Sequence, residues 1–300
     1  MKPVTKIVFT DDNGIKFFGE GPLRLLHFVE KTGSLRAAAM EMEMAYSKAS
    51  KILKQAENSL GFPLTARSTG GKDGGGSILT PEGKRWLRQY EAYRNACVKA
   101  NMELYRQYFP QIGCVIMASG LGKRFGSNKL MADFHGKPMI QRALDSTNDL
   151  FSKRVVVTRH ESIAALCREQ NVDVVLHDLP HRSDTVRLGL EALGDLDACI
   201  FLPGDQPLLR RETVANLLQS WQQNPNCIIR PIHEDTEGSP VLFPSWAFPE
   251  LKNLPEGKGG GFVIKKHPHE IIRVSVSDPF ELADADTPEI LEVLKGLCHD

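Results

Sequence analysis

Features that mark several large classes of proteins are missing from this 300-residue sequence. It has six cysteines, but no two of them form a C-x-x-C pair. Zinc sites and disulfide frameworks use tighter or more regular spacing, so we expect reduced thiols in a cytoplasmic protein. No apolar run approaches the roughly 20 residues that span a membrane, and the N-terminal segment lacks the apolar core of a signal peptide. We therefore expect no membrane partner.

A net charge is also lacking, because 37 basic residues balance 37 acidic ones. The balance hides an asymmetry, since residues 1–110 hold 17 Lys and Arg against 11 Asp and Glu, whereas the rest holds 20 against 26. A basic N-terminal third suits a polyanionic partner, and the acidic remainder argues against nucleic acid contacts there. Two ordinary solvated surfaces would give the same asymmetry, so it decides nothing alone.

Hydrophobic periodicity changes near residue 110. Residues 22–106 follow a mostly helical period, interrupted over residues 65–80 by a glycine-rich segment that predicts a β-hairpin. From Ile112 onward, short apolar runs alternate with helical stretches. This alternation predicts an α/β domain with a mostly parallel, Rossmann-like sheet and ligands at the carboxyl ends of its strands. We therefore predict two domains, residues 1–110 and residues 111–300.

The first domain has the element order of a winged helix-turn-helix, in which the second helix of the pair lies in the DNA major groove. That helix is expected to begin at Tyr46, where small and hydroxyl residues allow close approach and lysines meet phosphates or bases. The predicted DNA contacts are Tyr46, Ser47, Lys48 and Lys51, with Lys72 in the wing. A small helical dimerisation domain with solvated lysines is the alternative.

Segments of this first domain resemble the DNA-binding domain of ModE-type molybdate-responsive regulators. They lie at residues 33–39, 46–48 and 63–83, and the most specific part is a Gly-Gly-Lys-x-Gly-Gly-Gly wing followed by Leu-Thr-Pro-Glu-Gly. The resemblance covers about residues 20–95 and implies DNA binding by a homodimer. No segment resembles the molybdate-binding sensor of those regulators.

Three segments of the second domain carry residues suited to nucleotide chemistry. Residues 118–129 follow the first strand, and their glycine spacing fits neither the dinucleotide fingerprint nor the P-loop. Residues 201–207 are an apolar strand ending in Gly-Asp-Gln-Pro, where an aspartate is well placed to hold Mg²⁺. Asp284 and Asp286 precede a helix that starts with proline. Taken singly, these segments fit a tight turn, a turn-capping aspartate and a helix cap equally well.

The order of these motifs, with Gly-x-Pro-Val-Leu-Phe at residues 238–243, resembles the MobA-like NTP transferase family over nearly all of residues 112–298. Gly-Asp-Gln-Pro and Gly-x-Pro-Val-Leu-Phe are most similar to its molybdenum cofactor cytidylyltransferase (MocA) branch. The guanylyltransferase branch favours a Gly-Gly pair where this chain has Ser119-Gly120. Gly122 in place of a frequent serine, and a glycine-rich segment at residues 257–261 in place of an arginine-containing one, depart from the family. These two departures concern the identity of the acceptor and of the nucleotide base, and they do not concern the phosphate chemistry.

The resemblance implies Mg²⁺-dependent transfer of CMP from CTP to the molybdopterin cofactor, with release of pyrophosphate. It assigns the nucleotide phosphates to Ala118, Ser119, Gly120, Gly122 and Gly126. The catalytic candidates are Arg124, Lys129 and Asp205. The metal ligands are Asp205 and Asp286, with Asp284 as a substitute. The acceptor candidates are Arg182, Ser183, Asp184 and Arg187, which fit an ordinary capped helix equally well.

The implied partners are CTP or another NTP, the molybdopterin cofactor, DNA, a second copy of the chain and a molybdoenzyme that receives the finished cofactor. Two other functions stay open. One is the same chemistry with GTP or a sugar phosphate. The other is a transcription regulator whose second domain senses a nucleotide or pterin without turnover, although a sensor need not keep Lys129, Asp205 and Asp286. The histidines show no metal-ligand spacing, and none is given a role.

Overall fold

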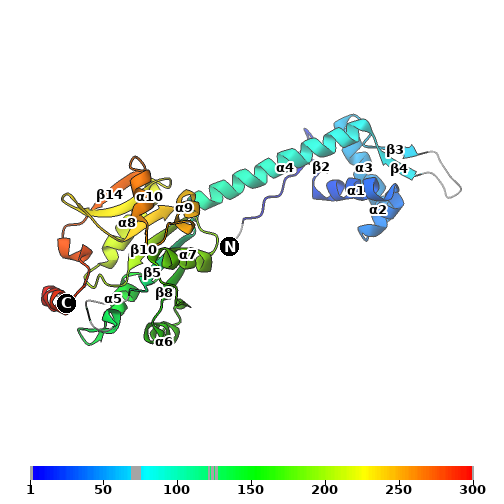
Figure 1. The fold of residues 1–300 in the computed structure, drawn as a ribbon. Helices are drawn as coiled ribbons and strands as arrows, with labels where there is room; N and C mark the ends of the chain where they lie inside the picture. Colours follow the sequence, from blue (N-terminus) through cyan, green and yellow to red (C-terminus); the bar gives the residue numbers. More distant parts are fainter. Residues whose placement is uncertain (1–2, 69–75, 121, 123–124, 126–127, 299–300) are drawn as a thin grey trace. The chain divides into compact units, whose positions relative to one another are not determined.

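The structure is a computed structural model that describes residues 3–68, 76–120, 122, 125 and 128–298. The chain divides between Tyr108 and Phe109 into two compact units (Figure 1). The division lies two residues before the boundary expected after residue 110. No helix of the described residues is long and apolar enough to cross a membrane. The six cysteines are all free thiols.

The first unit is a helical body with two small hairpins. Its elements are β1 (Phe9–Thr10), β2 (Lys16–Phe18), α1 (Glu20–Thr32), α2 (Leu35–Glu41), α3 (Tyr46–Leu60), β3 (Thr65–Ser68), β4 (Gly76–Leu79) and α4 (Pro81–Tyr108). The β3–β4 pair is antiparallel and forms the base of the expected wing. The β1–β2 hairpin was not expected, because its strands are too short to give an alternating pattern.

Local signals in the sequence account for the helix boundaries of this unit. Ser34 caps α2 by accepting a hydrogen bond from the Ala37 N–H at 3.3 Å. Gly33 and Gly61 end α1 and α3 in the left-handed conformation, with φ of 66° and 76°, which glycine adopts without steric cost. The helices bury their apolar faces against one another in a single core. The expected helix-turn-helix therefore has a packed interior of its own.

The second unit is built on a mixed sheet. Its main strands are β5 (Ile112–Ala118), β8 (Lys153–Thr158), β9 (Asp173–Leu176), β10 (Ala198–Pro203), β11 (Ile228–His233), β12 (Thr236–Glu237), β13 (Val241–Pro244) and β14 (Ile271–Ser275). Their order is β12-β11-β13-β10-β5-β8-β9, with β14 paired to β11. The pairs β10–β5, β5–β8, β8–β9 and β11–β14 are parallel, and β13 runs antiparallel to both of its neighbours.

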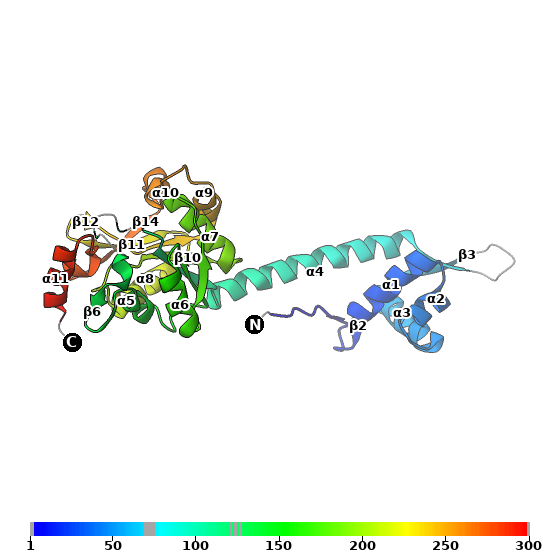
Figure 2. The same ribbon diagram turned by 60° about the horizontal axis from the view of Figure 1, so that its bottom comes forward.

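Helices cover both faces of this sheet (Figure 2). One face packs against α5 (Ile140–Ser146), α6 (Glu161–Glu169), α8 (Arg211–Gln223) and α11 (Pro288–Leu297). The other packs against α7 (Arg182–Leu193), α9 (Phe248–Lys252) and α10 (Gly261–Lys266). Side chains of β5 alternate between the two cores, with Cys114 and Ile116 on one side and Val115 on the other. Burial on both faces explains why these strands read as continuous apolar runs.

The predicted α/β class with a mostly parallel sheet is confirmed, and strands and helices alternate from Ile112 onward as expected. Three features were not predicted. They are the antiparallel direction of β13, the short helices α9 and α10, and the small hairpin of β6 (Asp133–Phe134) and β7 (Lys137–Pro138). Strand direction leaves no mark on an apolar run, and five- or six-residue helices are too short to show a period.

Candidate active site

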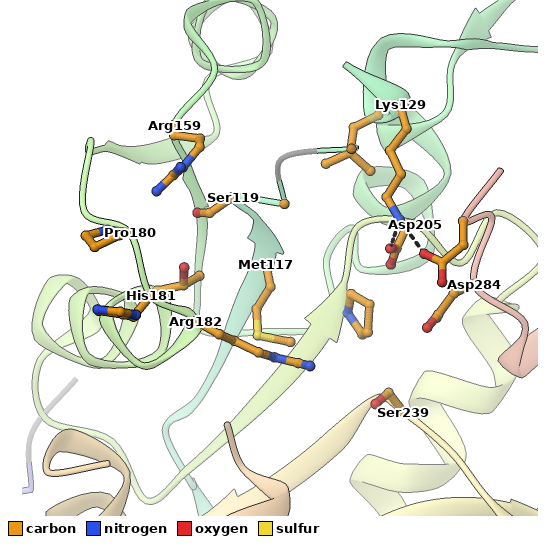
Figure 3. A pocket seen from close by; sticks show the side chains of 16 residues that line it. Met117, Ser119, Lys129, Arg159, Pro180, His181, Arg182, Asp205, Ser239 and Asp284 are labelled. Atoms are coloured by element: carbon orange, nitrogen blue, oxygen red, sulfur yellow. Dashed lines mark hydrogen bonds and ion pairs between the residues drawn. The ribbon is translucent and has the colours of Figure 1, made fainter. Parts of the chain in front are cut away.

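A cavity of about 730 Å³ lies at the carboxyl ends of the central strands of the second unit. Residues after β5, β8 and β10 line it, together with the start of α7 and the segment before α11 (Figure 3). This is the edge where ligands bind in open parallel sheets. Carboxylates gather at one end of the cavity, whereas Ser119, Arg159, Pro180 and His181 lie toward the other.

Lys129 is the centre of the carboxylate end. It starts a short 3₁₀ helix, Lys129–Met131, and only 10% of its side chain is exposed. Its Nζ lies 2.5 Å from Asp205 Oδ2 and 3.0 Å from Asp286 Oδ1. Burial alone would lower the pKa of Lys129, but the charges of Asp205 and Asp286 outweigh it and raise that pKa. The ammonium group therefore stays protonated and ties two distant segments together.

Backbone geometry fixes Asp205 at the end of β10. The Gly204 N–H donates to the Met117 carbonyl of the neighbouring strand at 3.0 Å. A Cβ at position 204 would lie 2.8 Å from Ile140 Cδ1 and 3.2 Å from the Met117 oxygen, so a larger residue would have to displace its neighbours. The glycine of Gly-Asp-Gln-Pro thus allows the close approach of the two strands that places the following aspartate at the cavity.

The segment that carries Asp284 and Asp286 is tethered to the same strand end. The Ala285 N–H donates to the Asp205 carbonyl at 2.8 Å. Gln206 is 3% exposed, and its Nε2 donates to Leu282 O at 3.1 Å and to Asp284 Oδ1 at 3.0 Å. Desolvation of the Asp284 carboxyl and the nearby charge of Asp205 raise the pKa of Asp284. Three carboxylates thus converge beside one ammonium group, which leaves an excess of negative charge.

This donor set fits a hard divalent cation. The Lys129 ammonium already occupies a cationic position between Asp205 and Asp286, which shows that the two carboxylates converge on positive charge. Oxygen donors are what Mg²⁺ prefers. Among the described residues, no group of three or more His, Cys, Asp or Glu side chains is arranged to hold a metal by itself. A bound cation would therefore need further oxygens from a ligand.

The glycine segment begins at a rigid point. Hydrogen bonds to residues at the end of β8 and directly after it hold the last residue of β5 and the two residues that follow. Thr158 Oγ1 donates to the Ala118 carbonyl at 2.9 Å, and Ser119 Oγ donates to the Val157 carbonyl at 3.0 Å. His160 Nε2 lies 3.0 Å from the Gly120 carbonyl and must be the donor, because a carbonyl only accepts. Ser119, Gly120 and Gly122 line the cavity, and Gly122 has a φ of 56°.

The predicted nucleotide and catalytic residues divide into three groups. Ser119, Gly120, Gly122, Lys129, Asp205 and Asp286 all line the one cavity, and so does Asp284. The Ala118 side chain is fully buried in the core, so only its backbone is available to a ligand. Arg124 and Gly126 lie outside the described residues.

Of the four acceptor candidates, Arg182 alone lines the cavity. The other three have positions typical of a capped helix. Asp184 Oδ2 accepts from the His181 N–H at 3.1 Å, which makes a capping box at the start of α7. Arg187 pairs with Asp184 and Glu191 on the helix surface, at 3.3 Å each. Ser183 is half-buried outside the cavity lining.

Sequence reasoning missed Arg159, His160, His177 and Gln206. Arg159 and His160 come directly after β8, and His177 directly after β9. Their position directly after a strand could have identified these three residues as site candidates, because the carboxyl ends of adjacent parallel strands meet at one edge of the sheet. The histidines were judged on metal-ligand spacing, which does not apply to residues that hold backbone and hydroxyl groups.

The first unit presents a separate candidate surface at the start of α3. Tyr46, Ser47, Lys48 and Lys51 are exposed there, while Ala49, Leu53 and Ala56 face the core. The Arg36 guanidinium lies over the Tyr46 ring, 5.8 Å from its centroid. Lys72 lies outside the described residues. The exposed face combines positive charge, hydroxyl groups and an aromatic ring, as a DNA-reading helix requires.

Comparison with known proteins finds two families. The family described as MobA-like NTP transferase domain matches residues 114–271, just over half of the chain. The family described as bacterial regulatory helix-turn-helix protein, lysR family, matches residues 22–84. The second match covers α1 to α3, the β3–β4 hairpin and the start of α4. Each match lies inside one of the two units.

Curated relatives match only parts of this chain. A 3-deoxy-manno-octulosonate cytidylyltransferase of Acinetobacter baumannii is 33% identical over 124 residues, which cover 37% of this chain and 49% of the relative. A probable molybdenum cofactor guanylyltransferase of Aquifex aeolicus is 29% identical over 112 residues, covering 37% and 54%. The molybdenum-pterin-binding protein MopB of Rhodobacter capsulatus is 35% identical over 81 residues, covering 27% and 30%. The chain thus spans about half the length of the two transferases.

Solved structures of other proteins have a similar fold over about three fifths of this chain. Rv0371c of Mycobacterium tuberculosis H37Rv has a TM-score of 0.57 and 21% identity, covering 62% of this chain and 98% of that protein. The same protein in complex with manganese gives a TM-score of 0.52 at 19% identity, covering 63% of this chain and all of that one. At this identity the likeness is one of fold.

Proposed function

Because this chain belongs to the MobA-like NTP transferase domain family, we propose that it transfers CMP from CTP to the molybdopterin cofactor and releases pyrophosphate. The observation that carries the proposal is the cluster of Lys129, Asp205 and Asp286 at the carboxyl edge of the sheet, next to a glycine segment. A protein that merely senses a nucleotide has no need of a lysine held between two carboxylates.

The reaction is a displacement at the α-phosphorus of CTP. A phosphate oxygen of the acceptor attacks that phosphorus, a new oxygen–phosphorus bond forms, and the bond to the bridging oxygen of the β-phosphate breaks, so that pyrophosphate leaves. Such a reaction needs positioning and charge neutralisation rather than a protein nucleophile. The N–H groups of the segment after β5 would hold the phosphates, and Lys129 would neutralise their charge, with Arg124 as a second cation.

Asp205 and Asp286 would hold Mg²⁺, which when bound supplies positive charge to the phosphate oxygens. Asp284 is the substitute ligand, held near Asp205 by Gln206. The manganese complex of Rv0371c supports a divalent cation in this fold. Metal binding would also relieve the repulsion among the three carboxylates.

Arg182 is the best-placed residue for the acceptor. It lines the cavity, and Gly259 lies against its guanidinium, where a Cβ would come within 3.1 Å of Nε. The glycine-rich segment that departs from the family pattern therefore leaves room for this arginine. A guanidinium in a cavity suits a phosphate-bearing acceptor, because it binds two phosphate oxygens at once.

Transfer of GMP is the second candidate, because the Aquifex aeolicus relative is described as a guanylyltransferase. The Ser119-Gly120 pair and the Gly-Asp-Gln-Pro motif favour CTP over GTP. The cytidylyltransferase name of the Acinetobacter baumannii relative points the same way.

The deciding experiment measures pyrophosphate release from CTP, GTP, ATP and UTP in turn, with Mg²⁺ and molybdopterin cofactor. We expect release with CTP alone, and a loss of about 100-fold or more in Asp205→Asn because a charge that binds the metal is removed. Asp235→Asn is the matched control, since Asp235 lies in the exposed turn between β11 and β12. Release with GTP instead of CTP would move the assignment to the guanylyltransferase reaction, and no release with any nucleotide would overturn it.

We further propose that the first unit binds DNA as ModE-type regulators do, through the exposed start of α3. The match to regulatory helix-turn-helix proteins and the likeness to MopB support this. In fluorescence anisotropy with a duplex from the protein's own promoter region, the double variant Lys48→Ala/Lys51→Ala should bind about tenfold more weakly and reduce the salt slope by about 2. Lys265→Ala, an exposed lysine of α10, is the control. An absence of binding at low salt would refute the proposal.

A further inference from the structure

His177 follows β9 and is not among the described residues that line the cavity, but its ring holds Ser119, which lines the cavity away from the carboxylates (Figure 3). His177 Nε2 lies 2.8 Å from Ser119 Oγ. The Leu179 N–H donates to His177 Nδ1 at 3.2 Å. Because Nδ1 accepts a hydrogen bond, the single proton of the neutral ring is on Nε2, which therefore donates to Ser119.

Both partners of His177 are tied to further strand ends. The Ser119 hydroxyl in turn donates a hydrogen bond to the Val157 carbonyl of β8, at an Oγ–O distance of 3.0 Å. The Leu179 carbonyl accepts from the Arg159 guanidinium, and Arg159 Nε is buried with no partner in the described part of the chain. His177 thus joins the ends of three neighbouring strands, β5, β8 and β9, through one ring.

The surroundings of His177 keep the ring uncharged. Desolvation lowers the pKa of His177, and the neighbouring Arg159 and the more distant Arg187 of α7 lower it further. Asp184 of α7 and the adjacent Asp178 act in the opposite direction without reversing the shift. A proton added at low pH would occupy Nδ1, so the ring would lose its bond from the Leu179 N–H and repel Arg159.

We infer that His177 is a positioning residue for the nucleotide: its Nε2–H tautomer holds Ser119 and the Leu179 peptide, and so fixes the start of the segment that would bind the nucleotide phosphates. The inference deepens the proposed nucleotidyl transfer and rests on it. His177 lies outside the cavity lining, and its partner Ser119 lies toward the end of the cavity away from Lys129 and Asp205 (Figure 3). It therefore governs nucleotide affinity, and the chemical step is left to the carboxylate cluster.

Three substitutions separate the two hydrogen bonds of the ring. His177→Ala removes both, His177→Gln keeps a donor near the position of Nε2, and His177→Asn keeps an acceptor near the position of Nδ1. We expect His177→Ala to bind Mg²⁺-CTP about tenfold more weakly in calorimetry, with kcat changed by less than about twofold, because two net hydrogen bonds are lost away from the reacting atoms. Gln and Asn should each restore part of the affinity.

The pH dependence of CTP affinity distinguishes this role from a merely structural one, which would leave that dependence unchanged. Affinity of the wild type should fall with acidification through the lowered pKa of His177, below its usual 6.5. His177→Gln and His177→Asn cannot titrate, so both should lose this decline. His233→Gln is the matched control, because His233 of β11 hydrogen-bonds the Val276 carbonyl and lies outside the cavity lining.

Nitrogen NMR of the imidazole tests the tautomer without any nucleotide. An Nε2–H ring supports the inference, and an Nδ1–H or charged ring at neutral pH overturns it. Equal CTP affinity in wild type and His177→Ala, or a large fall in kcat alone, overturns it as well. If the wild type binds neither Mg²⁺-CTP nor Mg²⁺-GTP, the proposed function fails, while the tautomer still decides the geometry assigned to His177.

Discussion

The carboxyl of Asp284 lies beside two other carboxylates, and its raised pKa has a consequence for stability. A folded state that raises this pKa binds the Asp284 proton more tightly than the unfolded chain does. The fold therefore loses stability as the pH rises from the unfolded value of 3.8 to the raised folded-state pKa, the loss is complete above that pKa, and it is absent well below 3.8. The repulsion belongs to a site that is ready for a cation, and it is greatest when no cation is bound.

We predict that Asp284→Asn raises the melting temperature of the metal-free protein. The rise should be about 1–2 °C at neutral pH, a small value because water screens a half-exposed carboxyl. It should disappear well below pH 3.8, where Asp284 is protonated in both states. The asparagine Oδ1 still accepts from Gln206, so only the charge is removed. Differential scanning fluorimetry in a chelator tests this against Asp235→Asn, and an unchanged or lower melting temperature at neutral pH would contradict it.

At the residue scale, motifs found the carboxylate cluster but not the residues that hold the rest of the cavity. Lys129, Asp205 and Asp286 belong to segments with a recognisable order, and they lie together in the structure. His160 and His177 act by donating to oxygen atoms that only the folded backbone brings near them. No spacing in the sequence encodes such contacts. Asp184 and Arg187, predicted as acceptor residues, take part in the capping and surface pairing of α7 and do not line the cavity.

At the element scale, helix α4 carries a stripe that its own unit leaves uncovered. No residue of α4 after Tyr90 is buried, although Leu104 and Tyr108 lie one turn apart and are 53% and 77% exposed. The N-terminal segment covers the same face nearer the start of the helix, where Tyr90 Oη donates to the Ile7 carbonyl and Asn101 Nδ2 to Thr5 Oγ1. Most helical stability in proteins comes from packing an apolar face, so this stripe suits a second copy of the chain.

We predict that the protein is a homodimer and that Leu104→Glu weakens the dimer about tenfold or more, because a charge replaces an apolar side chain in the interface. Sedimentation velocity over a range of concentrations measures the effect. Asn95→Glu adds the same charge on the opposite, polar side of α4 and should leave the dimer intact. A wild type that sediments as a monomer at all concentrations would rule out the predicted interface.

Elements were more predictable than their arrangement. Ser34, Gly33 and Gly61 mark helix ends through local hydrogen bonds and backbone conformation, and these signals act within a few residues. The antiparallel insertion of β13 between β10 and β11 depends on long-range pairing. An apolar strand buried on both faces fits either direction equally well, so the sequence predicted a mostly parallel sheet but missed the reversed strand.

At the scale of the whole molecule, opposite charges are divided between the two parts of the chain. The basic first 110 residues suit DNA, while in the proposed function the cavity of the acidic remainder would bind anionic phosphates through Lys129, arginines and a cation. A single chain with both surfaces would bring cofactor synthesis and transcription under one concentration of protein. Whether the two sites are coupled is a question of free energy, because a ligand shifts DNA binding only if its affinity differs between the free and DNA-bound protein.

We predict that the sites are coupled, so that saturating Mg²⁺-CTP changes the affinity of the full chain for its promoter DNA by about fivefold or more. Linkage requires that the DNA then change CTP affinity by the same factor, which gives two independent measurements of one quantity. Anisotropy with and without nucleotide supplies the first, and calorimetry with and without duplex supplies the second. Asp205→Asn, in which nucleotide binding is impaired, should abolish both effects and leave DNA binding itself intact. If neither ligand changes the affinity for the other, the two domains act separately. If the change in DNA affinity and the change in CTP affinity differ, nucleotide also binds outside the cavity.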